Sequence, residues 1–531
     1  MASHLLGAAA FVLVIACANV ANLARALRRE RELAVRTAMG AGALRLRGRL
    51  FAESLVLATL GAGLGVLIAG GLRDALVAYT ARFTPRTGEI AIDGGVLLFT
   101  LVVAVVTSVG FALVPGLVPG RRLSGALSSA AGRATASGMR RVVQRALVVG
   151  QIAVTFVLLV GAGLLVRTLY NLHAIDPGYQ LENVLSLEAP TFSQPTPEQR
   201  QQFAERAIEE IAAHPGVASA AMTQSAPLGG ASAFPMTIRL DGEPEDANAP
   251  PVPTVFETVS PSYFETLGVP IVRGRVFAAS DRADAQRVAI LNESAARHHF
   301  ADRDPVGRRI TYSFGSQVSQ EHTIVGIAAD TRPTGVDQEG VHALYLPAAQ
   351  SFAPSTMLVR TEGDPSPVAP LVVESLRNLD PQRPIEHVRT LAELRAESLA
   401  PQRLNATLFG VFAVLALLIA TIGVAAVVAF SVSARRREMG IRATFGASPL
   451  RLLAVVMRDG LWMTGIGLAV GAAAAAASSR LLAGLLFEVE PLDWGVFLLV
   501  AAVLLVVATV ASLVPARRAS SAQPVEVLRS E

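Results

Sequence analysis

Seven long apolar runs constrain the fold of this chain more than any other feature of its sequence. They cover residues 5–24, 54–72, 94–120, 146–166, 408–434, 461–479 and 494–516. Crossing a bilayer takes about 20 apolar residues, and none of the seven runs contains Asp, Glu, Arg or His. A charge at the centre of a span costs about 2.5–3.5 kcal/mol. The runs therefore predict an α-helical polytopic membrane protein with about seven spans.

The composition agrees with a membrane location and argues against a nucleic-acid-binding protein. The chain is 52% hydrophobic and 17% charged, with a mean hydropathy of +0.47. It contains no lysine, so all 46 basic residues are Arg, and its pI is near 9.7. The Arg residues cluster beside the apolar runs, which is typical of membrane topology. We therefore expect the lipid bilayer as the surroundings and no nucleic acid partner.

The placement of Arg orients the spans. Three Arg-rich loops lie on one side of them, at 25–49, 121–145 and 435–451. The loops on the other side are balanced in charge or acidic, at 80–93 and 485–493. By the positive-inside rule the Arg-rich loops are cytoplasmic, and the large block between the fourth and fifth runs lies outside.

The predicted topology places Met1 outside after only four residues. We therefore expect the chain to lack an upstream span and whatever preceded it. The alternative is a genuine short translocated tail.

One short basic sequence occurs twice, each time directly after an apolar run. Its copies, Arg31–Ala41 and Arg437–Ala447, keep Glu, Arg, Gly and Ala at the same spacing. In each copy Glu and Arg are four residues apart and can pair on one face of a helix, and Gly is placed to end it. The residues are Glu32, Arg36 and Gly40 in the first copy and Glu438, Arg442 and Gly446 in the second. We interpret both as docking helices; the alternative is solvated interfacial residues that support the topology.

The apolar runs around the two copies also match in order, so the halves repeat in parallel. Gly61 and Gly65 in the first half correspond to Gly467 and Gly471 in the second. Small residues at this spacing let membrane helices approach closely. We expect these glycines to mark helix packing, although glycine is common in such helices without a packing role.

The block outside the membrane shows mixed α/β patterning. Helical periodicity is present at Pro197–His214, Pro367–Leu379 and Leu391–Leu399. Strand-like runs occur at Val217–Met222, Val288–Leu291, Thr323–Ile327 and Met357–Val359. The last helix leads toward the fifth apolar run, so we expect a stalk that carries motion between the block and the membrane.

Several short motifs, together with the duplicated loops, carry a resemblance to a known family. They are Pro261–Gly268 (PSYFETLG), Arg273–Arg275 (RGR), Val288–Glu293 (VAILNE), Asp304–Arg308 (DPVGR) and Tyr345–Pro347 (YLP). The chain resembles the MacB/FtsX-like permeases, the membrane subunits of a class of ABC systems. It looks most like the long duplicated permeases, except that it starts after their leading span and first periplasmic domain.

The resemblance implies a domain plan and partners. The plan is a first FtsX-like permease unit of three spans at 1–125, a cytoplasmic linker and fourth span at 126–167, a periplasmic MacB-type core domain at 168–405, and a second FtsX-like unit of three spans at 406–531. The chain would be a pseudo-dimer in the bacterial inner membrane. Its duplicated loops would contact a separate cytoplasmic ABC ATPase, and the outer domain would meet a periplasmic partner or substrate.

Sequence patterns for catalysis, cofactors and metals are missing from the chain. A Walker A loop requires Lys, and the sequence has none. It also lacks the His-Glu-x-x-His and Gly-x-Ser-x-Gly motifs. Cys17 is the single cysteine, and His298 and His299 are the only adjacent histidines. We therefore expect no enzyme activity, no catalytic or cofactor-binding residues and no metal site.

Two functional hypotheses follow from these features. The first is a permease subunit that couples a separate ATPase to motion of the outer domain, for export or efflux across the cell envelope. The second is a mechanotransmission protein whose outer domain regulates an envelope partner without transport. The sequence does not name a substrate for either.

Overall fold

The protein, seen in a computed structural model, divides into two compact units. The structure describes residues 6–13, 16–17, 43–80, 92–113, 130–190, 196–228, 233–241, 251–301, 303–314, 317–336, 338, 341–351, 354–434, 448–482, 484 and 486–520. Met1–Tyr170 and Gln402–Glu531 form one unit, which we call the helical unit. Asn171–Pro401 form the other, which we call the α/β unit.

The helical unit is built from long apolar helices. Their bounds are α3 (Ala43–Thr80), α4 (Gly94–Leu113), α5 (Ala130–Ala174), α11 (Ala400–Ala434), α13 (Pro449–Leu482) and α14 (Trp494–Ser520). Within the described residues, four stretches are long and apolar enough to cross a membrane: Gln144–Ala174, Ala400–Val432, Leu453–Arg480 and Trp494–Leu513. The last four predicted runs fall on these stretches, which fits a polytopic membrane protein.

The first three predicted runs are less completely described. The run at 54–72 lies inside α3, while those at 5–24 and 94–120 lie partly outside the described residues. Gly94–Val106 is a shorter apolar helix. The count of seven spans therefore stays a prediction.

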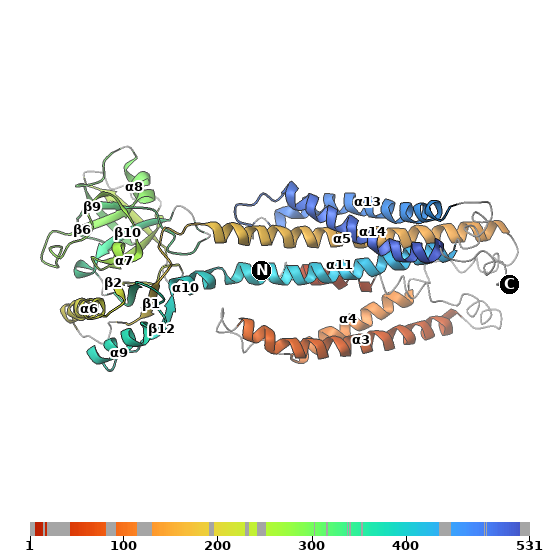
Figure 1. The fold of residues 1–531 in the computed structure, drawn as a ribbon, viewed down its shortest axis with the longest axis horizontal. Helices are drawn as coiled ribbons and strands as arrows, with labels where there is room; N and C mark the ends of the chain where they lie inside the picture. The colour runs from red at the N-terminus through yellow and green to blue at the C-terminus, as the bar shows by residue number, and fades with distance from the viewer. Residues whose placement is uncertain are drawn as a thin grey trace. The chain divides into compact units, whose positions relative to one another are not determined.

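Helix α5 packs against several other helices of the helical unit. It runs alongside α11, α13 and α14 (Figure 1) and contributes side chains to each apolar cluster of the helical unit. Ile152 packs with valines of α11, and Phe156 packs with residues of α13 and α14. Both side chains are 2% exposed. The fourth run, which lies outside the sequence repeat, thus packs against helices of the second half.

Within the residues that the structure describes, the α/β unit contains a 12-stranded sheet. Its strands are β1 (Val184–Glu188), β2 (Val217–Thr223), β3 (Ala233–Leu240), β4 (Val252–Val259), β5 (Ile271–Gly274), β6 (Val288–Asn292), β7 (Arg309–Phe314), β8 (Gln317–Val318), β9 (His322–Ala328), β10 (His342–Pro347), β11 (Thr356–Thr361) and β12 (Glu386–Thr390). Its helices are α6 (Pro197–Ala212), α7 (Tyr263–Leu267), α8 (Glu293–Phe300), α9 (Ala369–Leu379) and α10 (Leu391–Ser398).

Part of this sheet closes into a ring. The strands follow the order β10-β6-β9-β7-β3-β4, and β10 pairs again with β4 in parallel from His342↔Thr254 to Pro347↔Val259. Alternate residues of β3 join one apolar core with Phe300 of α8. Because successive strand residues point to opposite faces, the alternation fills the inside of the ring.

The rest of the sheet is open and antiparallel, in the order β2-β11-β1-β12. Among the described strands, it pairs with the ring at Thr223↔Val259. Helices α6 and α9 lie together on one face (Figure 1), where Phe203 and Val372 pack against Leu187 and Met222. The helices and strands predicted from sequence periodicity in this block are confirmed, with ends shifted by a few residues.

Candidate functional site

The predicted ATPase-coupling residues lie outside the described residues. This applies to Glu32, Arg36, Gly40, Glu438, Arg442 and Gly446. Helix α11 ends at Ala434 and α13 begins at Pro449, so the second loop lies between two described helices. The docking role of both loops stays a prediction.

Gly467 and Gly471 lie where α13 meets α5. A Cβ atom added at Gly467 would lie 2.8 Å from Cβ of Ile152. One added at Gly471 would lie 2.8 Å from Cβ of Phe156 and 3.0 Å from Cα of Ala153. Real Cβ contacts are almost never that short, so both positions require glycine for the observed approach.

The matching glycines of the first half have different surroundings. Among the described residues, nothing lies within 4 Å of a Cβ added at Gly61 or Gly65 on α3. The two glycine pairs share a sequence offset but not a neighbour. The difference arises because α5, which is not duplicated, packs against the second pair.

Ion pairs mark both ends of the apolar stretch of α5. Arg145 lies 3.4 Å from Asp459 of α13, and Arg167 pairs with Asp493 at the start of α14. These two Arg residues are about 33 Å apart along a helix that rises 1.5 Å per residue. That length matches the hydrocarbon thickness of a bilayer. The pairs therefore indicate where α5 leaves the membrane.

Within the α/β unit, Arg395 joins α10 to the end of α5. Its Nη2 donates to the carbonyl oxygens of His173 at 2.7 Å and Ile175 at 2.8 Å. Because α5 ends at Ala174, these two carbonyls lie at the C-terminal end of that helix. A positive charge at a helix C-terminus is also favoured by the helix dipole. One guanidinium therefore ties together the segments by which the chain enters and leaves this unit.

The start of α10 is fixed by a capping box. Thr390 Oγ1 accepts from the backbone N–H of Glu393 at 3.2 Å, and the Glu393 carboxylate accepts from the N–H of Thr390 at 2.8 Å. Arg389, on β12, forms an ion pair with Glu397 of this helix. Such caps contribute about 1 kcal/mol. They hold α10 in register between β12 and α11.

A buried carboxylate joins the ring to the open part of the sheet. Glu257 of β4 is 3% exposed. Thr223, at the end of β2, donates its hydroxyl to Glu257 Oε2 at 3.0 Å, and the Ser225 hydroxyl donates to the other oxygen. Burial raises the pKa of Glu257 to about 7, although these hydrogen bonds favour the charged form.

Buried tyrosines share this region of the α/β unit. The hydroxyl of Tyr179 donates to Thr331 Oγ1 at 3.1 Å, and Tyr345 OH lies 3.2 Å from the same oxygen. Burial raises the pKa of Tyr179 and Tyr263 well above the usual tyrosine value. The tyrosines therefore stay neutral, and Glu257 is the group of this cluster that titrates near neutrality.

The variant Glu257→Gln is expected to be more stable than the wild type above pH 7. In the unfolded wild type Glu257 has the usual glutamate pKa, about 4.3, whereas in the folded state its pKa is about 7. Between these two pH values the folded state holds a proton that the unfolded state has released. Stability is therefore full below this window and is lost as pH rises through it, by up to about 3 kcal/mol. The amide stays neutral and can still bond both hydroxyls. Thermal unfolding of the detergent-solubilised chain at pH 5 and pH 8 measures the difference.

The control for this experiment is Glu265→Gln, an exposed acid on the neighbouring helix α7. It should keep the wild-type pH dependence. If Glu257→Gln and the wild type lost stability equally between pH 5 and pH 8, the assigned role of Glu257 would be wrong.

Comparison with known families agrees with this architecture. A model of the MacB-like periplasmic core domain matches residues 146–372. A model of the FtsX-like permease C-terminal region matches residues 5–126 and 410–524. The chain belongs to the MacB/FtsX-like ABC permeases. It is thus a multi-pass membrane protein with a large domain of the periplasmic type.

Individual relatives of this permease are distant. It is 22% identical to the uncharacterized ABC transporter permease YknZ of Bacillus subtilis over 281 residues, which are 51% of this chain and 69% of YknZ. It is 26% identical to the macrolide export ATP-binding/permease protein MacB of Sodalis glossinidius over 297 residues, or 51% of this chain and 43% of MacB. The chain therefore spans less than half of that MacB.

A solved structure also matches the permease. The periplasmic region of MacB from Actinobacillus actinomycetemcomitans aligns with 43% of this chain and 96% of that chain. The TM-score is 0.30 and the sequence identity is 12%.

The motif Pro261–Gly268 of the permease has a packing role. Tyr263 and Phe264 are each 2% exposed, and the Phe264 ring lies 5.3 Å from that of Tyr345, centroid to centroid. Gly268 ends α7 with a φ of +66°. A Cβ there would lie 2.4 Å from the Gln180 side chain. The motif therefore seats α7 on the sheet rather than offering groups for chemistry.

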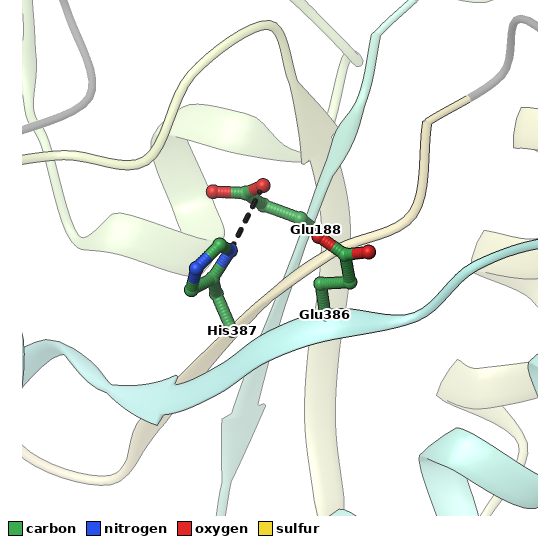
Figure 2. A group of neighbouring side chains, drawn as sticks. All are labelled: Glu188, Glu386 and His387. Atoms are coloured by element: carbon green, nitrogen blue, oxygen red, sulfur yellow. Dashed lines mark ion pairs between the residues drawn. The ribbon is translucent and has the colours of Figure 1, made fainter. Parts of the chain in front are cut away.

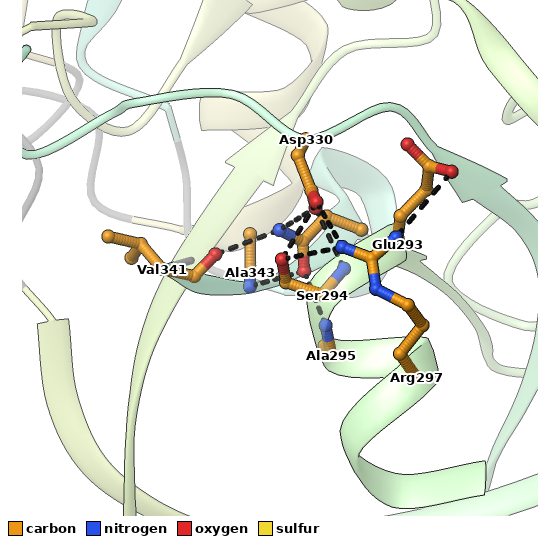
Figure 3. Close-up of polar contacts among 8 residues, drawn as sticks. Glu293, Ser294, Ala295, Arg297, Asp330, Val341 and Ala343 are labelled. Carbon is orange, nitrogen blue, oxygen red and sulfur yellow. Dashed lines mark hydrogen bonds and ion pairs between the residues drawn. The ribbon is translucent and has the colours of Figure 1, made fainter. Parts of the chain in front are cut away.

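The motif that ends at Glu293 of the permease builds a polar network (Figure 3). The Asn292 amide donates to Asp330 at 2.7 Å and to the Val341 carbonyl at 2.8 Å, and its oxygen accepts from the N–H groups of Ala295 and Ala343. Asn292 is fully buried. Because each of its hydrogen-bonding positions is used, the network stabilises the junction of β6, α8 and β10.

Three histidines meet in the α/β unit of the permease. The structure brings His342 to the adjacent pair, with ring centroids 4.8 Å from His298 and 6.0 Å from His299. Burial and the neighbouring rings lower the pKa of His299 to about 4. Sequence analysis weighed only the adjacent pair, since a third ring that is distant in sequence gives no local signal.

Two residues of the permease that sequence reasoning missed are Arg395 and Glu257. Arg395 lies inside the predicted helix Leu391–Leu399, but nothing in the pattern marks its partner at the end of α5. Glu257 interrupts an apolar strand, Val252–Val259. A lone acid in such a strand is a usable signal, because strands of this kind seldom bury a charge without partners.

Proposed function

We propose that this chain is the permease subunit of a MacB/FtsX-type ABC system in the bacterial inner membrane. A separate cytoplasmic ATPase drives it, and nucleotide-dependent closure at the duplicated loops moves the periplasmic domain for export or efflux across the envelope. Seven spans and two permease units, related by a pseudo-two-fold axis, form the membrane part. The family of the chain supports a role as an ABC permease, and the proposal adds how that permease would work.

The observation that carries this proposal is the double contact of Arg395. Motion that enters the α/β unit along α5 would be shared with α10, because the carbonyls of His173, in the last turn of α5, and of Ile175, just after it, bind the same guanidinium. Helix α10 ends at Ser398 and α11 begins at Ala400. The chain therefore leaves the α/β unit through two helices that are separated by one residue.

The membrane helices favour mechanical work over a relay of ions. The seven apolar runs contain no Asp, Glu, Arg or His. The one acid inside a described spanning stretch, Asp459, pairs with Arg145 near an end of that stretch. A proton or ion pathway needs ionisable groups inside the bundle. Substrate handling therefore falls to the periplasmic domain.

Exchange of Glu32 and Glu438 for Arg in one variant should abolish recovery of the ATPase. The chain has no lysine and so no standard P-loop, and ATP hydrolysis that co-purifies with it comes from another protein. Reversing an interfacial charge costs several kcal/mol, so the recovered ATPase activity should fall at least about tenfold. The measurement is vanadate-sensitive ATP hydrolysis after affinity purification of the tagged chain from native membranes.

The control is Glu182→Arg, which reverses an exposed acid of the α/β unit. It should leave the recovered activity unchanged at equal membrane abundance. Full ATPase recovery with the double variant would contradict the docking role of the loops.

A further inference from the structure

A cross-strand cluster on the open sheet brings three potential metal ligands together. Glu188 lies on β1, and Glu386 and His387 begin β12. One ligand atom from each side chain lies within 4.8 Å of the others, and His387 Nδ1 is 3.1 Å from Glu188 Oε2. Figure 2 shows the imidazole of His387 facing the Glu188 carboxylate, with the Glu386 side chain beside them.

The backbone at this point departs from a regular strand pair. Glu386 and His387 are consecutive and would normally point to opposite faces. His387, however, has a φ of +50°, and the register of β1 against β12 shifts between Ser186 and Glu188. The irregularity brings the ring and the neighbouring carboxylate to one side.

The charges of the cluster are unbalanced. Glu188 and Glu386 are directly opposite each other in the register, and like charges in this position destabilise a strand pair. His387 forms an ion pair with the Glu188 carboxylate, and the Glu386 carboxylate has no ion pair or hydrogen bond with any residue that the structure describes. A bound cation would neutralise both carboxylates at once.

The donor set and spacing select the class of cation. Zn²⁺ binds His nitrogen and carboxylate oxygen at about 2.0–2.2 Å, so two ligands of a tetrahedral site lie about 3.3 Å apart. The observed 3.1 Å between His387 Nδ1 and Glu188 Oε2 fits this spacing, and the Glu386 carboxylate, within 4.8 Å of both, would have to move closer on binding. Ca²⁺ and Mg²⁺ prefer oxygen ligands alone, whereas imidazole suits Zn²⁺ and its transition-metal neighbours.

We propose that Glu188, Glu386 and His387 form a binding site for a divalent transition metal ion, with Zn²⁺ as the best fit. The side chains of Glu188 and His387 are 45% and 52% exposed, so a hydrated ion can reach them. Three protein ligands leave a fourth position for water. The ion would pin β12 to β1 directly before α10.

The test measures Zn²⁺ binding to the purified full chain in detergent by competition with a chromophoric chelator. The wild type should bind one Zn²⁺ at this site, and His387→Ala should bind it at least about tenfold more weakly. Glu386→Gln should lose the site equally, and it keeps the fold because that carboxylate makes no other described bond. With Cu²⁺ as a second probe, electron paramagnetic resonance should show coupling to a single imidazole nitrogen.

The matched control is His298→Ala, which removes an exposed histidine of the other cluster. It should keep the site, which separates specific binding from uptake by the three histidines. Equal Zn²⁺ affinity of the wild type, His387→Ala and Glu386→Gln would overturn the proposal and leave an adventitious ion only. A loss seen with His298→Ala but not with Glu386→Gln would move the site to the histidine cluster and overturn it as well.

Discussion

Replacing Gly471 by valine is expected to destabilise the helical unit strongly. A Cβ at this position meets Cβ of Phe156 at 2.8 Å and the backbone of Ala153 at 3.0 Å. Backbone atoms cannot move aside without separating α13 from α5. Overpacking of this kind costs about 1–3 kcal/mol or more. Thermal unfolding in detergent, followed by fluorescence-detected gel filtration, should show a fall in Tm of roughly 5–10 °C.

The chain contains its own control for this experiment. Gly65 occupies the corresponding position of the first half, and nothing among the described residues lies within 4 Å of a Cβ placed there. Gly65→Val should therefore keep the wild-type Tm within a few degrees. Equal losses for the two variants would mean that glycine acts through helix propensity at both positions and not through packing.

The contrast between the two glycine pairs shows what the sequence can and cannot predict about helix packing. Their matching offsets predict equivalent helices, but not which helix packs on them. The partner of Gly467 and Gly471 is α5, which has no counterpart in the repeat. Periodicity of apolar residues is a local property, whereas the choice of neighbour depends on the assembled bundle.

The α/β unit shows the same division between local and long-range information. Helix α6 was predictable because Pro197 and an apolar face mark it, and the structure adds a cap from Thr196. The ring depends on parallel pairing of β4 with β10, about 90 residues apart in the chain. The cluster of Glu188 with His387 joins segments that are separated still further. None of these partners leaves a pattern within one segment.

Two buried polar residues, Glu257 and Asn292, show how segments of the α/β unit join. Glu257 lies in an otherwise apolar strand, so hydrophobic patterning does not single it out. Asn292 belongs to the motif Val288–Glu293, but nothing in the pattern names its partners. In the structure both form hydrogen bonds with partners from other segments of the chain. A polar group that stays buried needs such partners. Residues of this kind locate the joints of a fold.

Loss of the Arg395 side chain is expected to uncouple the α/β unit from nucleotide-driven motion. Arg395→Ala removes two hydrogen bonds from a charged donor to the end of α5, at 2.7 and 2.8 Å. Such bonds contribute about 1.5–3 kcal/mol, which is roughly a ten- to hundredfold change in the equilibrium between the joined and separated segments. The coupling should fail although the ATPase still binds and turns over.

Amide hydrogen exchange of the ATPase-bound chain, with and without ATP and vanadate, measures this coupling. In the wild type, trapping the nucleotide should change exchange in β1, β12 and α10, and in Arg395→Ala the change should disappear while ATP hydrolysis persists.

Arg395→Lys keeps the charge but replaces the planar guanidinium with a single ammonium donor, so it should retain part of the response. Arg377→Ala, which removes an exposed Arg of α9, should behave as the wild type. An unchanged nucleotide response in Arg395→Ala would show that motion reaches the α/β unit by a route other than this contact, because no other part of the variant differs.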